Sequence, residues 1–107
     1  MKASIYISLL LLIVSCKSTL SQNSPQKIFQ NHISVVEQLL KGEEVSNLKT
    51  TIEFLEEITN IKSEVDIGWE IMYSPSEQNL KDWKTWYRNN KKLLYWDEKE
   101  NKVKVRI

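Results

Sequence analysis

Few side chains in this sequence are of a type that performs acid–base or metal chemistry. His32 is the only histidine, and no nucleophile or metal ligand can be placed beside it from the sequence. Glu53, Glu56 and Glu57 follow the i, i+3, i+4 spacing that brings carboxylates to one side of a helix. These carboxylates could bind a cation or form an acid–base pair. Without a matching motif elsewhere, a packed histidine and a solvated helix face are the favoured interpretations.

Composition narrows the classes of function further. The 107 residues suffice for one small domain, and two isolated glycines cannot form a phosphate-binding loop. The 15 basic and 14 acidic residues almost balance, whereas a nucleic-acid-binding protein shows a basic excess. We therefore expect that the protein is not an enzyme, holds no metal or cofactor, and does not bind nucleic acid.

The charges are unevenly distributed along the chain. Residues 37–70 contain nine acidic and three basic side chains, whereas residues 71–107 contain five acidic and nine basic ones. The simpler interpretation is two solvated faces that attract each other within one fold. The alternative is a charged patch that binds a partner.

Aromatic residues are the strongest candidates for a binding surface. Seven of them crowd into 28 residues: Trp69, Tyr73, Trp83, Trp86, Tyr87, Tyr95 and Trp96. Tryptophan and tyrosine bind sugar rings, organic cations and protein partners, but a small domain with two phenylalanines also needs them for its core. Trp83 and Trp86 are predicted to be core residues. Tyr95 and Trp96 would point to opposite faces of a strand, so the predicted partner contacts are Tyr95, Trp96 and Trp69.

The single cysteine, Cys16, cannot form an intramolecular disulfide, and ligands for a zinc site are scarce. Its context is more informative. Lys2 is followed by an apolar run over residues 5–14, which ends at Ser15. This run is shorter than the roughly 20 residues that span a membrane, and it is typical of the apolar region of a secretory signal. A plain signal peptide or a single-span anchor with an incidental cysteine remains an alternative.

The segment Ile13-Val14-Ser15-Cys16 resembles the lipobox of the bacterial lipoprotein signal family, although Ile replaces the commoner Leu at its first position. The resemblance implies that residues 1–15 are a signal peptide and that the Cys16 thiol receives diacylglycerol. The new amino terminus would then be acylated, for example with palmitate. Several acyl chains hold a protein stably to a membrane. Lys17 is not the aspartate that retains some lipoproteins in the inner membrane, which favours the outer membrane.

The remaining chain predicts a short tether and a helical domain. Residues 16–23 are polar and serine-rich, as in a flexible tether. Ser24 and Pro25 then begin a helix that ends near Gly42. A second helix is predicted over residues 43–59, antiparallel to the first. In Ser74-Pro75-Ser76-Glu77, Ser74 as N-cap and Glu77 as its partner predict a capping box for a third helix that ends near residue 90.

Two segments do not follow a helical pattern. In residues 62–73 the apolar residues alternate around Gly68, which fits either an extended segment or, as we favour, an irregular loop. Residues 93–107 predict a β-hairpin with a loop over residues 97–101. The predicted fold is therefore mainly α: an N-terminal signal helix, then a three-helix domain over residues 24–107 with a small C-terminal β-hairpin.

The C-terminal half is also similar to uncharacterised exported bacterial proteins, through the pattern Trp83-Lys84-Thr85-Trp86-Tyr87 and the following Leu94-Tyr95-Trp96-Asp97. That resemblance implies no activity. Together, these features predict a lipoprotein of the bacterial cell envelope, held to the membrane through lipid on Cys16. It would act as a non-catalytic module that binds another envelope protein. The alternative is a glycan-binding lipoprotein that uses exposed aromatic side chains.

Overall fold

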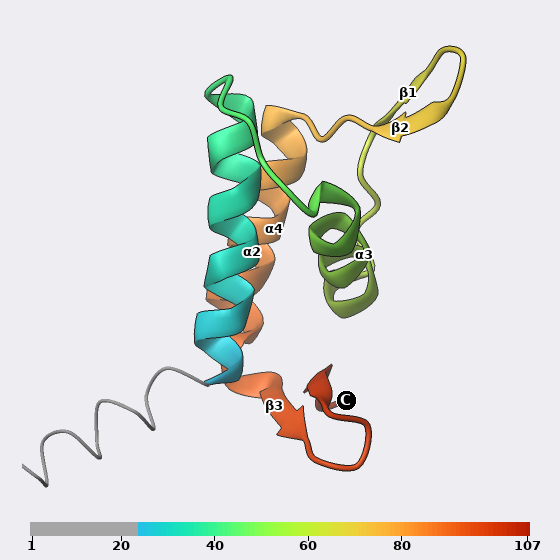
Figure 1. The fold of residues 1–107 in the computed structure, drawn as a ribbon. Helices are drawn as coiled ribbons and strands as arrows, with labels where there is room; N and C mark the ends of the chain where they lie inside the picture. Colours follow the sequence, from blue (N-terminus) through green and yellow to red (C-terminus); the bar gives the residue numbers. More distant parts are fainter. Residues whose placement is uncertain (1–23) are drawn as a thin grey trace, which may run out of the picture.

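The computed structural model describes residues 24–107. The predicted signal peptide, Cys16 and the predicted tether over residues 16–23 lie outside the described residues. The described part contains three α-helices and two antiparallel strand pairs (Figure 1). The predicted three-helix domain with a C-terminal hairpin is thus confirmed. A second hairpin, in the middle of the chain, was not predicted.

Helix α2 (Pro25–Leu40) begins and ends as the sequence predicts. The Ser24 side chain accepts a hydrogen bond from the Lys27 backbone N–H at 3.1 Å, and Pro25 occupies the first helical position. At the other end, Gly42 has φ +86°, a left-handed conformation that glycine adopts without strain. The apolar face of α2 is buried through Phe29, Ile33 and Val36.

Helix α3 (Leu48–Thr59) begins five residues later than residue 43, where the sequence predicted its start. The Glu43 N–H donates to the Gln38 carbonyl at 3.0 Å, so Glu43 closes α2 and does not open α3. Asn47 then adopts a left-handed conformation, which interrupts any helix preceding Leu48. The end of α3 at Asn60, also left-handed, agrees with the prediction.

Helix α4 (Glu77–Asn90) has a capping box, but its residues are not the predicted pair. The N-cap is Ser76, and its partner is Asn79 at the third helical position. The prediction of Ser74 and Glu77 was wrong by two residues. Asn79 Oδ1 accepts from the Ser76 N–H at 2.9 Å and also from the Glu64 N–H at 3.0 Å. A tertiary contact that local sequence rules do not include therefore helps to fix the start of this helix.

Residues 65–73 form a β-hairpin, so the favoured interpretation of an irregular loop was wrong. Strands β1 (Val65–Ile67) and β2 (Ile71–Tyr73) pair antiparallel around a turn at residues 68–70. The alternating apolar residues noted in the sequence fit this pairing. The hairpin projects from the helices (Figure 1, yellow), which leaves Val65, Ile67, Ile71 and Met72 exposed.

The C-terminal hairpin agrees with the prediction. Strands β3 (Leu94–Asp97) and β4 (Lys102–Val105) pair antiparallel, and a short 3-10 helix, η1 (Lys91–Leu93), connects β3 to α4. The turn covers residues 98–101, one residue fewer than expected, because Asp97 pairs with Lys102. Within the turn, Asp97 Oδ1 accepts from the N–H groups of residues 99 and 100.

The core lies where the three helices meet the C-terminal hairpin. Its buried apolar residues come from every one of these elements: Phe29, Ile33, Val36, Ile52, Leu55, Trp83, Leu94 and Val103. Trp83 is fully buried, and its indole N–H donates to the Ile61 carbonyl at 3.2 Å. Trp86 is half-buried and stacks on Phe29 at 5.7 Å between ring centroids. Both tryptophans therefore pack in the core, as predicted.

Candidate functional site

His32, the first candidate for acid–base chemistry, connects two helices. Its Nδ1 lies 3.0 Å from the Thr51 hydroxyl, at hydrogen-bond distance, and its ring stacks on Phe54 with centroids 4.2 Å apart. Burial lowers the pKa of His32 from its ordinary value of 6.5, because the charged form loses hydration. The arrangement is that of a packing residue which joins α2 to α3.

The three glutamates of α3 do not act as one group. Glu53 faces Lys49 at 3.8 Å, Glu56 accepts from the Ser63 N–H at 2.9 Å, and Glu57 forms an ion pair with Lys102 at 2.9 Å. Each carboxylate thus has a separate structural partner. Within residues 24–107, no three His, Cys, Asp or Glu side chains gather in a way that could hold a metal ion.

Ion pairs connect the acidic and basic parts of the chain. Glu57 with Lys102, and Glu37 with Lys84 at 3.1 Å, each join a residue of the acidic segment to one of the basic segment. These contacts support the interpretation of two attracting faces. They do not include Glu64, Asp66 or Glu70, which form no ion pair among the described residues.

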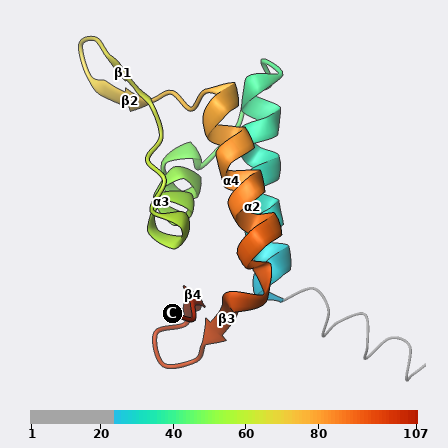
Figure 2. The same cartoon turned by 180° about the vertical axis from the view of Figure 1, so that it is seen from behind.

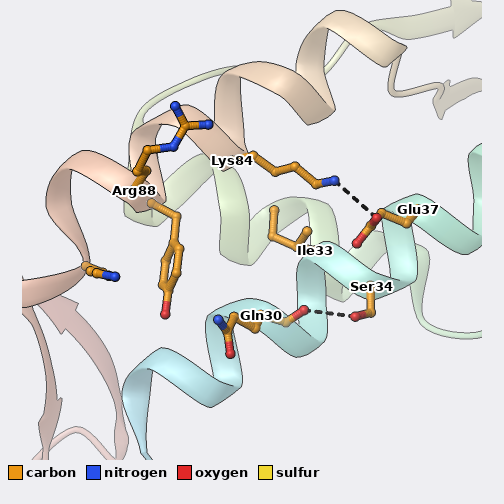
Figure 3. A pocket seen from close by; sticks show the side chains of 8 residues that line it. Gln30, Ile33, Ser34, Glu37, Lys84 and Arg88 are labelled. Carbon is orange, nitrogen blue, oxygen red and sulfur yellow. Dashed lines mark hydrogen bonds and ion pairs between the residues drawn. The ribbon is translucent and has the colours of Figure 1, made fainter.

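A hollow of about 440 Å³ lies between α2 and α4 (Figure 3). The Glu37–Lys84 ion pair crosses it, and Ile33 lies between the two helices. The Ser34 hydroxyl donates its hydrogen bond to the Gln30 backbone carbonyl at 3.2 Å, within the same helix. The hollow offers neither an activated nucleophile nor a base beside one.

The structure separates the three predicted partner contacts. Trp69 lies in the turn of the β1–β2 hairpin, with a relative exposure of 105%. Tyr95 and Trp96 lie on β3, at the other end of the molecule (Figures 1 and 2). Trp96 is 40% exposed, but Tyr95 is half-buried, and the Arg106 guanidinium covers its ring at 4.5 Å. They therefore cannot form one contact surface.

The β1–β2 hairpin is the main exposed apolar surface in the part of the chain that the structure describes. The pairs Val65–Tyr73 and Ile67–Ile71 put four apolar side chains on one face. Ile67 is 78% exposed and Ile71 is 75% exposed. We call Val65, Ile67, Trp69, Ile71, Met72 and Tyr73 the hairpin surface. The alternating pattern in residues 65–71 was the signal for it, although sequence reasoning selected only Trp69.

An open hollow of about 570 Å³ adjoins the hairpin surface at the start of α3. Its lining is mostly apolar and combines both elements: Leu48, Lys49, Val65, Ile71, Met72 and Tyr73. The only charged residue of this lining, Lys49, faces Glu53. A hollow of this kind can take an apolar side chain from a partner.

Both elements that border this hollow carry acidic residues. Glu64, Asp66 and Glu70 belong to the hairpin segment, and Glu53 and Glu56 lie nearby on α3. The pKa of the Tyr73 hydroxyl is raised from 10.0 by desolvation first, and then by the negative charges of Glu56 and Glu53. Tyr73 therefore lies in a negative electrostatic potential. In the strand pairing Asp66 lies opposite Met72, so it is on the other face of the hairpin from Val65 and Ile71.

Comparisons with family models, curated proteins and solved structures find no match to this chain. None of the helices formed by residues 24–107 is long and apolar enough to cross a membrane.

Proposed function

We propose that this protein is a lipid-anchored accessory protein of the bacterial cell envelope that acts by binding another protein. The lipobox-like segment that ends at Cys16 supports the anchor and the address. The exposed hairpin surface supports the binding of another protein, and it is the main observation behind the proposal. Binding through this surface requires no catalytic group.

The exposure of the hairpin surface contrasts with the close burial of the core. Phe29, Val36 and Trp83 are fully buried, so the fold does not lack a core in which to place such side chains. Contiguous exposed apolar patches on small proteins mark interaction sites. Aromatic residues such as Trp69 often contribute much of the binding energy in a protein interface.

The position of the hairpin suits a protein that is anchored through its N-terminus. Both views place the start of α2 at one end of the molecule and the β1–β2 hairpin at the other (Figures 1 and 2). A lipid attached before Ser24 would therefore leave the hairpin on the side that faces away from the attachment. The tether predicted over residues 16–23 would extend its reach.

The glycan-binding alternative is less well supported. A sugar ring stacks on a free aromatic face, but the Arg106 guanidinium covers the Tyr95 ring. The β1–β2 hairpin, whose turn contains Trp69, and strand β3, which contains Trp96, lie at opposite ends of the molecule (Figure 1), so the two side chains cannot hold one short glycan together. The geometry thus favours a protein partner at the hairpin surface.

The test is a pull-down from envelope membranes with the full chain in three forms. The forms are the natural protein, the double variant Trp69→Ala/Ile71→Ser, and Trp96→Ala as the matched control. We expect the natural protein and Trp96→Ala to retain the same partner protein, and the hairpin variant to retain it at least about tenfold less. Because Trp69 and Ile71 are exposed, the double variant should remain folded, as circular dichroism can confirm. Equal recovery with all three forms would contradict the proposal.

A further inference from the structure

The free edge of β2 can accept another strand. Hydrogen-bonded and non-hydrogen-bonded pairs alternate in an antiparallel ladder. The bonds from Ser74 N–H to the Glu64 carbonyl at 2.9 Å and from Gly68 N–H to the Glu70 carbonyl at 3.4 Å fix this alternation. The backbone groups of Ile71 and Tyr73 consequently point away from β1. Since the sheet has only two strands in the described chain, these groups are available to a third.

The hollow lies beside this same strand. Ile71, Met72 and Tyr73 of β2 line it together with Leu48 of α3. An extended segment paired with β2 would point every second side chain toward the apolar face of the hairpin. It would need apolar residues at these alternate positions.

The charges on and around the hairpin indicate which side chains would suit the remaining positions of such a segment. Residues 43–77 contain nine acidic and two basic side chains. Glu56 and Glu53 of α3 make the electrostatic potential at Tyr73 negative, and Lys49 is compensated by Glu53. Lysine or arginine between the apolar residues would complement this field and guide association.

The same charges disfavour other occupants. A second copy joined hairpin to hairpin would bring two acidic surfaces together, and an anionic membrane would be repelled. The basic strand β4 has the right alternation, but Val103 is buried in the core of its own molecule and cannot serve a second copy. The complementary occupant is therefore a segment of a different protein.

Resting on the proposed function, we infer that the β1–β2 hairpin binds an extended segment of its partner in which Lys or Arg alternates with apolar residues. The segment adds a strand to β2. Its apolar side chains enter the hollow between β2 and Leu48. Its cationic side chains lie on the other face of the added strand, the face on which the hairpin carries Asp66. The partner is thus recognised by backbone pairing, apolar contact and charge together.

The test uses synthetic peptides and the full chain in detergent micelles, observed by nuclear magnetic resonance. The probes are a peptide of alternating Lys and Val, one of alternating Glu and Val, and a Lys–Val peptide whose valine amides are N-methylated. We expect the Lys–Val peptide to shift the resonances of Val65, Ile71 and Tyr73. It should bind at least about tenfold more tightly than the Glu–Val peptide, and more weakly as salt rises. N-methylation removes the backbone donors and should abolish binding.

Three results would overturn the inference: equal binding of both charge types, unchanged binding after N-methylation, or resonance shifts confined to residues outside the hairpin surface and Leu48. Failure to bind any peptide would do so as well. The pull-down separates this failure from failure of the proposed function. If the hairpin variant loses a partner that the natural protein retains, but the Lys–Val peptide does not bind, the hairpin still binds a protein and only the inferred chemistry is wrong.

Discussion

Single residues in this protein take their roles from burial more than from their chemical type. His32 is the clearest case, because its ring is stacked on Phe54 and its Nδ1 contacts a buried threonine. Trp69 is fully exposed in the turn of the β1–β2 hairpin, so it contributes nothing to the core and remains the proposed contact residue. The sequence favoured a packed role for His32, and the structure places it between α2 and α3 as expected.

The lowered pKa of His32 predicts a dependence of stability on pH. The pKa of His32 is about 6.5 in the unfolded chain and lower in the fold. Between these two pKa values the imidazole is protonated to a greater extent in the unfolded chain than in the folded protein. The free energy of unfolding should therefore fall as the pH drops from 7.5 through 6.5 toward the lower pKa of the folded state. Urea unfolding of the natural protein and of His32→Gln at pH 7.5 and 6.0 measures this. A fall of equal size in the variant would show that His32 is not responsible.

At the scale of elements, Asn79 connects the start of α4 to the segment before β1. Replacement by Ala removes the acceptor shared by the Ser76 and Glu64 N–H groups, which should cost about 2 kcal/mol of unfolding free energy. Asn79→Asp keeps an acceptor and loses the 3.4 Å bond to the Lys62 carbonyl, so it should cost less. Thermal or urea denaturation compares the variants. Equal losses would indicate that the shared acceptor is not what stabilises this junction.

The accuracy of the sequence predictions followed the range of the interactions involved. Ser24, Asn60 and the β3–β4 alternation depend on neighbours in sequence, and the corresponding boundaries were predicted. The start of α4 depends on Glu64, fifteen residues away, and was placed two residues early. The β1–β2 hairpin was missed because its two strands are only three residues long and Gly68 interrupts the alternation of apolar residues. A short, interrupted pattern of this kind is also typical of an irregular loop. The role of this hairpin as a surface could not be predicted, since exposure is decided by the whole fold.

At the scale of the whole molecule, two ends have different properties. One end carries the start of α2 and the C-terminal hairpin, and the other carries the acidic and apolar β1–β2 hairpin. With the proposed lipid on Cys16, the first end would lie toward the membrane and the second toward a partner. The ion pairs of Lys84 and Lys102 hold the acidic and basic segments together between them.

The proposed anchor predicts a specific covalent modification. In cells given a labelled fatty acid, the full chain should become labelled and move to the membrane fraction, because several acyl chains bind a bilayer stably. Cys16→Ser should abolish both, whereas Ser18→Ala, a matched change two residues away, should leave both intact. Labelling that persists in Cys16→Ser would contradict lipid attachment at Cys16. It would not bear on binding through the β1–β2 hairpin.

Site-specific photo-crosslinking in cells can show whether the β1–β2 hairpin contacts another protein in the envelope, as we propose. A photoreactive amino acid replaces Trp69 in one full-length variant and Glu98, exposed in the turn of the other hairpin, in a matched one. After irradiation of intact cells, we expect one discrete protein adduct from position 69 and none of that mass from position 98. The same adduct from both positions, or none from position 69, would contradict this proposal.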